Sequence, residues 1–260
     1  MVLGRWLRKP MEKYQGRLCG CAPGTHALLE EMIRRHVAPC AGVLDIGAHS
    51  GALLLRLEAG GFTDLVGTDL DPTRFDCPGA KFQRMELNRA FSADFDRKFR
   101  LITCADVIEH LDSPRNLIQE ARLLLEEDGF LAISLPNVAY WEGRCKFVLK
   151  GELWGFGQGN YRVQRHISPV TFEQMEMMMQ ELGFAVVAAE SGGSFATPLR
   201  QALTLPLWGP LRVIGGRRVL GESAVFLAKK APPLAELKSP VHYRDRWQGT
   251  PDRIGLEDAK

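Results

Sequence analysis

Short apolar runs alternate with segments of helical periodicity from residue 42 onward, and this alternation restricts the fold more than any other feature of the chain. Runs of this kind predict strands that are buried on both faces, and an intervening helix allows consecutive strands to pair in parallel. The pattern therefore predicts an α/β fold with a doubly wound, mostly parallel sheet and helices on both faces. The runs are GVLDIG, DLVGTDLD, KFQRMEL, RLITCADVI, GFLAISLP, FAVVAAE and SAVFLAKK.

Helix signals are clearest in three segments. Apolar residues recur at helical spacing in His26–His36. Ser113 is a suitable N-cap for a helix over Pro114–Asp128, which we expect Gly129 to end. A second capped helix is expected over Ser168–Gly183.

Changes in composition and apolar periodicity along the chain predict three parts. Residues 1–40 form an N-terminal helical cover, and residues 41–231 form the main domain. Two inserts interrupt this domain, at 137–167 and at 191–222, and the second is too long for a plain loop, so we expect it to be partly helical. Residues 232–260 have few apolar side chains and are expected to be a loosely docked tail.

The charge is nearly balanced overall but not locally. The 260 residues include 33 basic and 31 acidic side chains, a formal net charge of +2 that gives no argument for a nucleic-acid partner. Residues 41–139 contain 10 basic and 16 acidic residues, whereas residues 197–230 contain 6 and 1. We therefore expect an acidic cofactor half, a basic flank and no nucleic acid.

The six cysteines do not form the pattern of a disulfide scaffold, because they are widely scattered in a large chain. Cys19 and Cys21 lie upstream of His26, His36 and Cys40, but this spacing is not that of a zinc site. We expect reduced thiols and no bound metal.

No stretch has the apolar length of a membrane span, and the first ten residues lack the apolar centre of a secretion signal, so a cytoplasmic location is expected. The basic apolar stretch Leu199–Arg218 allows two interpretations. A cover over the substrate pocket is the favoured one, and contact with a membrane surface is the alternative.

The stretch VLDIGAHSG, residues 43–51, predicts a buried strand that ends in a turn with Gly47 and Gly51. A dinucleotide fingerprint that starts at Gly47 would need glycine where the chain has His49 and Ala52. S-adenosylmethionine has no phosphate and can bind a turn with fewer glycines, so it is favoured over NAD. The next strand ends at Asp69, where a carboxylate can accept hydrogen bonds from ribose hydroxyls.

Five segments in order resemble the motifs of class I S-adenosylmethionine-dependent methyltransferases of the small-molecule branch. They are LDIGAHSG, VGTDLDP, FQRMEL, ITCADVIEHL and GFLAISLPN, and the segment PNVAYWEGRCKFVLKG resembles the MetW group. The resemblance covers roughly residues 27–190 and 223–230. It implies a Rossmann-like sheet of seven strands with the last strand antiparallel. It also implies S-adenosylmethionine as the cofactor.

The resemblance also implies which residues bind that cofactor. The methionine end would contact the first turn, the ribose the end of the second strand, and the adenine the residue that follows this strand and the third motif. The fourth motif would line the pocket near the methyl group. In that order these residues are Asp45, Gly47, Ala48, His49 and Gly51; Asp69; Leu70, Glu86 and Leu87; and Asp106 and Val107. His49 departs from the glycine that is usual in the family.

Methyl transfer to a hydroxyl group needs a base, and histidine suits this role near neutral pH. His110 and His166 are the candidates. Acceptor recognition is assigned to the insert after Pro136, because loops at the carboxyl ends of strands form the crevice in open α/β sheets. The candidate acceptor residues are Asn137, Tyr140, Trp141, Tyr161, Arg162 and Arg165.

We therefore expect an enzyme that methylates an oxygen or nitrogen of a small molecule. One alternative is a methyltransferase-like protein that binds the cofactor without catalysis and acts through a partner. A second alternative is an NAD-dependent oxidoreductase. The sequence does not identify the acceptor.

Overall fold

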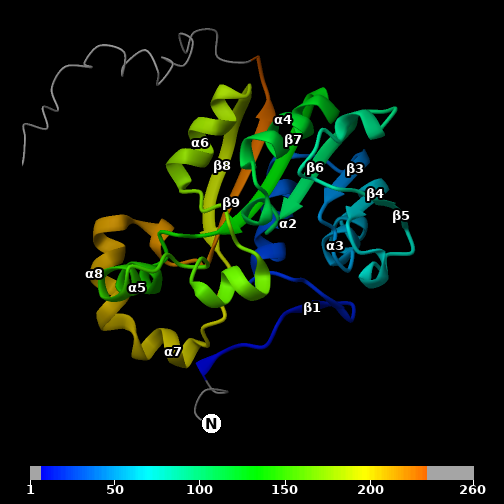
Figure 1. Ribbon diagram of the computed structural model, residues 1–260. Helices are drawn as coiled ribbons and strands as arrows, with labels where there is room; N and C mark the ends of the chain where they lie inside the picture. The colour runs from blue at the N-terminus through cyan, green and yellow to red at the C-terminus, as the bar shows by residue number, and fades with distance from the viewer. Residues whose placement is uncertain (1–6, 233–260) are drawn as a thin grey trace, which may run out of the picture.

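The structure is a computed structural model that describes residues 7–232, and a seven-stranded sheet forms its centre (Figure 1). The strands are β3 (Ala41–Ile46), β4 (Thr63–Asp69), β5 (Ala80–Arg84), β6 (Phe99–Ala105), β7 (Leu125–Pro136), β8 (Phe184–Gly192) and β9 (Ser223–Lys230). Their order is β5-β4-β3-β6-β7-β9-β8, and β9 runs antiparallel to both of its neighbours. Strands β3 to β7 pair in parallel. The predicted α/β fold with an antiparallel last strand is confirmed.

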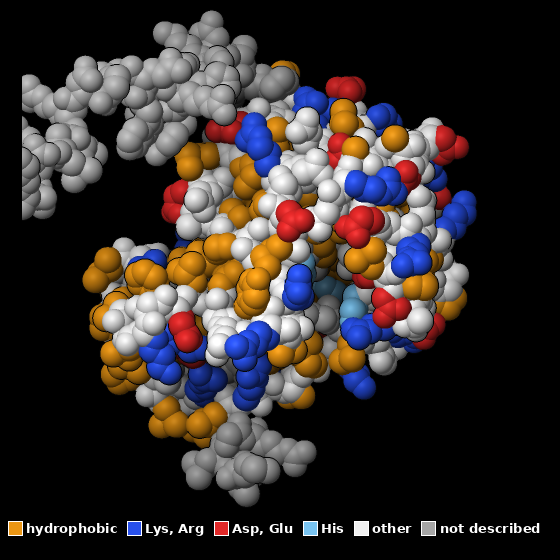
Figure 2. Space-filling view, in the orientation of Figure 1, with side chains coloured by type: hydrophobic (Ala, Val, Ile, Leu, Met, Phe, Trp, Pro, Cys, Tyr) orange, Lys and Arg blue, Asp and Glu red, His pale blue; other side chains and the backbone are white. Residues whose placement is uncertain are grey.

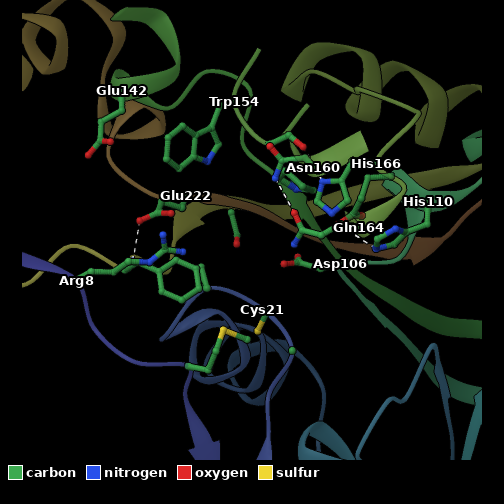
Figure 3. Close-up of a pocket in the computed structure, with 18 of the residues that line it drawn as sticks. Arg8, Cys21, Asp106, His110, Glu142, Trp154, Asn160, Gln164, His166 and Glu222 are labelled. Atoms are coloured by element: carbon green, nitrogen blue, oxygen red, sulfur yellow. Dashed lines mark hydrogen bonds and ion pairs between the residues drawn. The ribbon is translucent and has the colours of Figure 1, made fainter. Parts of the chain in front are cut away.

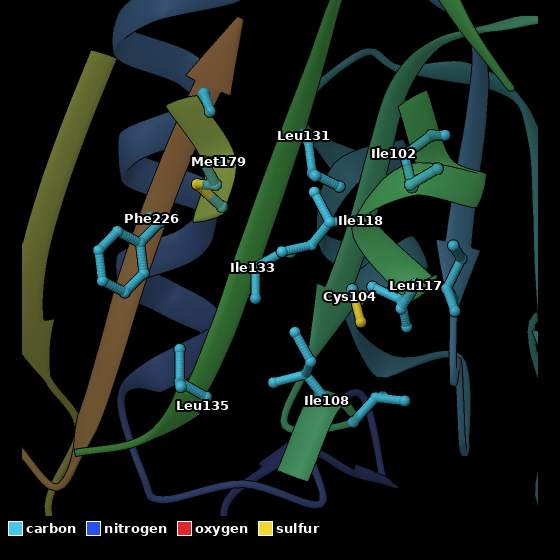
Figure 4. Close-up of a cluster of buried hydrophobic side chains, with 14 of the residues drawn as sticks. Ile102, Cys104, Ile108, Leu117, Ile118, Leu131, Ile133, Leu135, Met179 and Phe226 are labelled. Carbon is cyan, nitrogen blue, oxygen red and sulfur yellow. The ribbon is translucent and has the colours of Figure 1, made fainter. Parts of the chain in front are cut away.

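Helices cover both faces of the sheet because successive strand residues point to opposite sides. Val43 packs with α2 (Thr25–His36) and α3 (Ala52–Ala59), whereas its neighbour Leu44 packs on the other face. That second face is covered by α4 (Pro114–Leu124) and α6 (Phe172–Glu181). Figure 4 shows Ile118, Ile133 and Phe226 among the apolar side chains of this second core.

The predicted end of the helix after Ser113 is wrong. Ser113 caps α4 as expected, with its side chain accepting a hydrogen bond from the N–H of Asn116. The helix ends at Leu124, and Gly129 lies within β7. Leu125 is already extended and pairs with Phe99 of β6, so sheet pairing replaces the last predicted helical turn.

The predicted cap of the next helix is also wrong. Thr171 caps α6 in a reciprocal capping box with Gln174. Ser168 instead donates its hydroxyl hydrogen to the carbonyl of Leu111, which ties the chain to the loop after β6.

Both inserts contribute helices at one end of the molecule (Figure 1). The first contains α5 (Trp141–Lys150) and a π-helical turn over Asn160–Gln164. The second is partly helical, as expected, with α7 (Pro198–Leu203), α8 (Leu205–Gly215) and a 3-10 turn, η5 (Arg217–Val219). A short hairpin, β1 (Lys13–Tyr14) and β2 (Arg17–Leu18), precedes α2. The tail expected over 232–260 lies outside the described residues except for its first position.

No helix in residues 7–232 has the length and apolar character needed to cross a bilayer.

The side chain of Asn137 joins the start of the first insert to the end of the second. This residue follows β7 and is 1% exposed. Its Nδ2 group donates to the carbonyls of Arg218 and Gly221, and its Oδ1 accepts from the N–H of Ala139. Because these groups are buried, loss of the amide leaves backbone carbonyls without a donor.

We expect Asn137→Ala to lower the free energy of unfolding by about 2 to 4 kcal/mol, because two buried carbonyls lose their hydrogen bonds. Urea denaturation followed by circular dichroism measures this change. Asn116→Ala is the matched control, since the Asn116 amide makes one exposed hydrogen bond to the carbonyl of Arg89. An equal loss of stability in the two variants would contradict the anchoring role.

Candidate functional site

The turn between β3 and α3 requires glycine at both of its ends. Gly47 has a φ angle of 73°, and a Cβ atom there would overlap the Cγ2 methyl group of Val107. Gly51 has a φ angle of 79°, and a Cβ atom there would lie 2.7 Å from the Cβ of Cys77. L residues with side chains rarely adopt this conformation, and neither position has space for one. The turn therefore brings bare backbone to the carboxyl edge of the sheet.

His49 lies in the middle of this turn and also has a left-handed backbone, with φ of 48°. Its N–H donates to the Oδ2 of Asp69 at 2.9 Å. The ring packs beside Gly20, and its Nε2 lies 3.2 Å from an Arg74 guanidinium nitrogen. The imidazole lines a hollow with Arg17 and Arg74, and it does not line the cavity of about 690 Å³ at the end of β6.

Asp69, at the end of β4, holds the loops around it. Its Oδ2 accepts from His49, and its Oδ1 accepts from the N–H of Asp71 at 3.2 Å. Each carboxylate oxygen keeps a second lone pair that can accept another donor. Leu70 is about half exposed beside it, so the end of β4 presents both a carboxylate and an apolar side chain to solvent.

The other cofactor candidates follow neighbouring strands at the same edge. Glu86 and Leu87 come after β5, and Asp106 and Val107 come after β6, on the two sides of the β3–β4 pair. Glu86 accepts the N–H of Asn88 at 2.9 Å, and Leu87 packs partly against the core. The carboxyl ends of β5, β4, β3 and β6 thus place these residues along one edge of the sheet, where open α/β folds have their ligand crevice.

Asp45 lies below this crevice, inside the sheet. It is 2% exposed and accepts a 2.7 Å hydrogen bond from the hydroxyl of Thr103 on β6. Burial raises the pKa of Asp45 to about 7. Its side chain therefore supports the turn from beneath, next to β6.

A cavity of about 690 Å³ opens at the end of β6 (Figure 3). The N-terminal segment, the end of β6 and both inserts all contribute to its wall. The lining includes Arg8, Cys21, Asp106, Glu109, His110, Glu142, Lys146, Trp154, Asn160, Gln164, His166, Arg200 and Glu222. The cavity is rich in charged and amide groups, which suits an acceptor with polar substituents.

Asp106 connects the crevice to this cavity. Its backbone is left-handed, with φ of 52°, and its Oδ1 accepts a 2.6 Å hydrogen bond from the Ser134 hydroxyl. The N–H of Asp106 donates to the carbonyl of Ser134 at 3.0 Å. Burial raises the pKa of Asp106, because the charged carboxylate loses hydration.

His110 and His166 meet at the wall of the cavity, although 55 residues separate them in sequence. Their ring centroids lie 4.8 Å apart, with the planes at 83°. The Nδ1 of His166 lies 2.7 Å from the carbonyl of Gly155, so Nδ1 carries the hydrogen and Nε2 has a free lone pair when the ring is neutral. Burial and the neighbouring His110 lower the pKa of His166, which keeps the ring neutral.

Glu109 lies beside this histidine pair and is 1% exposed. Its Oε1 is 4.0 Å from the Nε2 of His110, and its Oε2 has no hydrogen-bond partner among the described residues. Burial and the nearby Asp106 raise the pKa of Glu109 well above its usual range. The ligand atoms of Glu109, His110 and His166 lie within 4.8 Å of one another, so these three side chains have the chemistry to hold a divalent cation.

The candidate acceptor residues lie in two different environments. Asn137, Tyr140 and Trp141 are buried, and none of them lines the cavity. Tyr161, Arg162 and Arg165 are exposed on or next to the π-helical turn, and they also lie outside the cavity lining. Asn160 and Gln164 of the same turn do line it.

Sequence reasoning missed several lining residues that come from distant parts of the chain. Cys21 lies in the N-terminal segment, Glu142 on α5, Arg200 on α7 and Glu222 just before β9. The Arg200 guanidinium bonds both carboxylate oxygens of Glu142 at 2.7 Å. No local motif marks Cys21, Arg200 or Glu222, because only the packing of the N-terminal segment and the second insert over the end of β6 brings them into the cavity wall.

Comparison with known proteins finds one matching family profile and individual proteins that are similar to this chain. The profile of a methyltransferase domain matches residues 13–189. A 40-residue stretch is 50% identical to the ubiquinone biosynthesis O-methyltransferase of Glaesserella parasuis serovar 5, over 15% of this chain and 17% of that protein. The chain thus spans about a sixth of the length of this curated relative.

Solved structures share the fold. An S-adenosylmethionine-dependent methyltransferase from Archaeoglobus fulgidus superposes with a TM-score of 0.55 at 18% identity, over 79% of this chain and 95% of that one. The magnesium protoporphyrin IX methyltransferase of Synechocystis PCC 6803, solved with bound S-adenosylhomocysteine, gives 0.51 at 13% identity, over 79% and 81%. At these identities the likeness shows the fold alone.

The family profile, unlike the structural likeness, spans more than half of the chain and includes the glycine turn and the ends of β4, β5 and β6. The match to a methyltransferase domain agrees with the expectation that the cofactor is S-adenosylmethionine, and it excludes the alternative of an NAD-dependent oxidoreductase. The chain belongs to the methyltransferase-domain family.

Proposed function

We propose that the protein methylates an oxygen or nitrogen of a small molecule that binds in the 690 Å³ cavity. The observation that supports this most strongly is the position of His166 at the cavity wall, where the carbonyl of Gly155 holds Nδ1 and leaves Nε2 available next to His110. An acceptor hydroxyl must lose its proton as the new bond forms, and a neutral imidazole is suited to take it.

The residues of the crevice fit the cofactor. The turn runs from Gly47 to Gly51 and includes Ala48 and His49. Its two glycines carry no side chain where they pack against neighbouring residues, so the turn can contact the methionine end through its backbone. We assign the ribose hydroxyls to Asp69 and the adenine to Leu70, Glu86 and Leu87. When bound, S-adenosylmethionine supplies a methyl group that its sulfonium charge has already activated.

Asp45, Asp106 and Val107 complete this assignment at the end of β3 and β6. Asp45 supports the turn through its bond with Thr103, and Val107 fills the space against Gly47. Asp106 lines the cavity and is held by Ser134, so it can position an acceptor or the methionine end between crevice and cavity. The main work of these residues is to align the two reactants and exclude water.

Acceptor contacts are proposed for the first insert, with Asn160 and Gln164 of the π-helical turn inside the cavity. Tyr161, Arg162 and Arg165 of this turn are assigned to the rim, where an acceptor's outer groups would pass. Tyr140 and Trp141 shape the wall from behind, since the ring of Tyr140 lies 4.8 Å from that of Trp154. The side-chain amide of Asn137 acts by donating hydrogen bonds to backbone carbonyls of the second insert.

The enzymatic proposal is tested by S-adenosylhomocysteine formation when the protein is incubated with S-adenosylmethionine and a panel of phenols, hydroxy acids and amines. We expect at least one oxygen or nitrogen acceptor to be methylated, with the product identified by mass spectrometry. Methylation at carbon or sulfur alone would contradict the proposal. Cofactor binding without turnover on any fraction of a metabolite extract would favour the non-catalytic alternative.

Asp69→Asn should weaken S-adenosylhomocysteine binding at least tenfold, because charged hydrogen bonds to two hydroxyls become neutral ones. Isothermal titration calorimetry measures the dissociation constant. Asp128→Asn removes a carboxylate that pairs with Lys229 near the start of β7, away from the crevice, and serves as the control. Equal affinities of Asp69→Asn and wild type would exclude Asp69 from the ribose site.

His166→Gln should lower kcat for a hydroxyl acceptor by about a hundredfold and leave S-adenosylhomocysteine affinity unchanged. Since the pKa of His166 lies below its usual 6.5, the neutral base persists through neutral pH. Wild-type kcat should therefore fall only as the pH drops below about 6.5, where the ring becomes protonated. NMR titration of the histidine side chains gives an independent readout, and a His166 pKa above 6.5 would contradict the assignment.

A further inference from the structure

Two segments from different parts of the chain form one lobe beside the sheet. We define the insert lobe as residues 141–165 and 197–218, which contain α5, the π-helical turn, α7, α8 and the first two residues of η5. Figure 1 shows α5, α7 and α8 grouped at one end of the molecule, and α8 contributes no residue to the lining of the cavity. A cover over the pocket, the role expected for residues 199–218, therefore does not explain α8.

The insert lobe exposes apolar side chains that a water-soluble surface rarely presents together. It makes up about a fifth of the described residues but contains twelve of their eighteen exposed large hydrophobic side chains. None of the residues of α8 is buried. The five most exposed of these side chains are 80–86% exposed, and they are Val148, Leu149, Val163, Val213 and Ile214.

Basic residues surround these apolar side chains. The insert lobe contains 9 Lys and Arg against 2 Asp and Glu, whereas the rest of the chain contains 24 against 29. One of the two acidic residues, Glu142, is already paired with Arg200. Seven basic side chains of the lobe pair with no carboxylate among residues 7–232, and they are Arg144, Lys146, Lys150, Arg162, Arg165, Arg212 and Arg217. Figure 2 shows blue side chains among the orange ones in this region.

The combination of exposed aliphatic groups and excess positive charge favours an anionic bilayer over a second copy of the chain as the partner of this surface. A symmetric dimer would place one lobe against a second one, so that two surfaces with a charge of +7 would repel each other without acidic partners. An anionic bilayer satisfies both features, because acyl chains accept Val, Leu and Ile while phosphate headgroups accept Lys and Arg. Short helices interrupted by Pro206 and Pro210 lie on such a surface without crossing it.

We propose that the insert lobe docks on the surface of an anionic lipid bilayer, with α8 and the C-terminal half of α5 in contact with the lipid. This inference does not depend on the acceptor or on the histidine base. It has one consequence for the cavity, since Glu142 and Lys146 of α5 and Arg200 of α7 belong both to the lobe and to the cavity lining. Docking would place the cavity next to the headgroup layer, where amphipathic acceptors concentrate.

Co-sedimentation of the full chain with vesicles tests the proposal. We expect binding to vesicles of 30% phosphatidylglycerol in phosphatidylcholine, at least tenfold weaker binding to pure phosphatidylcholine, and loss of most binding at high salt. Equal partition into the two vesicle types, or no binding to the anionic ones at low salt, would overturn it.

Two pairs of variants separate the apolar and the charged contributions. Val213→Glu with Ile214→Glu should reduce the partition coefficient more than tenfold, whereas Leu123→Glu with Met177→Glu, at exposed positions of α4 and α6, should change it less than twofold. Arg212→Gln with Arg217→Gln should reduce binding about tenfold on anionic vesicles only. Lys81→Gln with Arg84→Gln on β5 is the charge-matched control.

The replaced side chains are exposed, so circular dichroism and thermal unfolding should be unchanged in all variants. Sedimentation velocity tests the competing occupants. A dimer that Val213→Glu with Ile214→Glu dissociates, combined with absence of vesicle binding, would assign the surface to a second copy of the chain and overturn the proposal.

Discussion

The close approach of the β3 turn to the end of β6 determines how the site is assembled. Gly47 leaves no space for a side chain against Val107, so the first turn and the loop after β6 lie in direct contact. This contact places the crevice, where the residues proposed to bind the cofactor lie, next to Asp106 and the cavity. Below it, the buried bond between Asp45 and Thr103 joins β3 to β6. A side chain at position 47 would separate the two reactant sites.

The sheet and its crevice were predictable because their signals are local. Apolar runs between helical segments are sufficient for the seven strands, and glycines that need a left-handed backbone mark the turn at Gly47 and Gly51. Errors arose where a local signal competed with a tertiary contact. Ser168 has the chemistry of a helix cap, but its hydroxyl donates to the carbonyl of Leu111. Gly129 was expected to end a helix, but it lies within β7.

The cavity was less predictable, since its wall depends on long-range packing. His110 and His166 were identified individually from their chemistry, but their meeting at 4.8 Å follows from the path of the first insert. Cys21, Arg200 and Glu222 have no motif around them, and each lines the cavity because a separate segment folds over the end of β6. The distribution of charge, by contrast, was visible in the sequence, and the structure gathers it into one lobe with exposed aliphatic side chains.

The first insert is held firmly at both of its ends. At its start, the amide of Asn137 is bonded to the backbone of the second insert. At its far end, the N–H groups of Ile167 and Ser168 both donate to the backbone carbonyl of Glu109, immediately beside His166. Between these two anchors, the carbonyl of Gly155 lies 2.7 Å from the Nδ1 of His166 and the ring of Phe156 packs against the imidazole. The segment proposed to recognise the acceptor is therefore also the segment that orients the histidine proposed to accept a proton, so a change in its length or composition would alter both roles together.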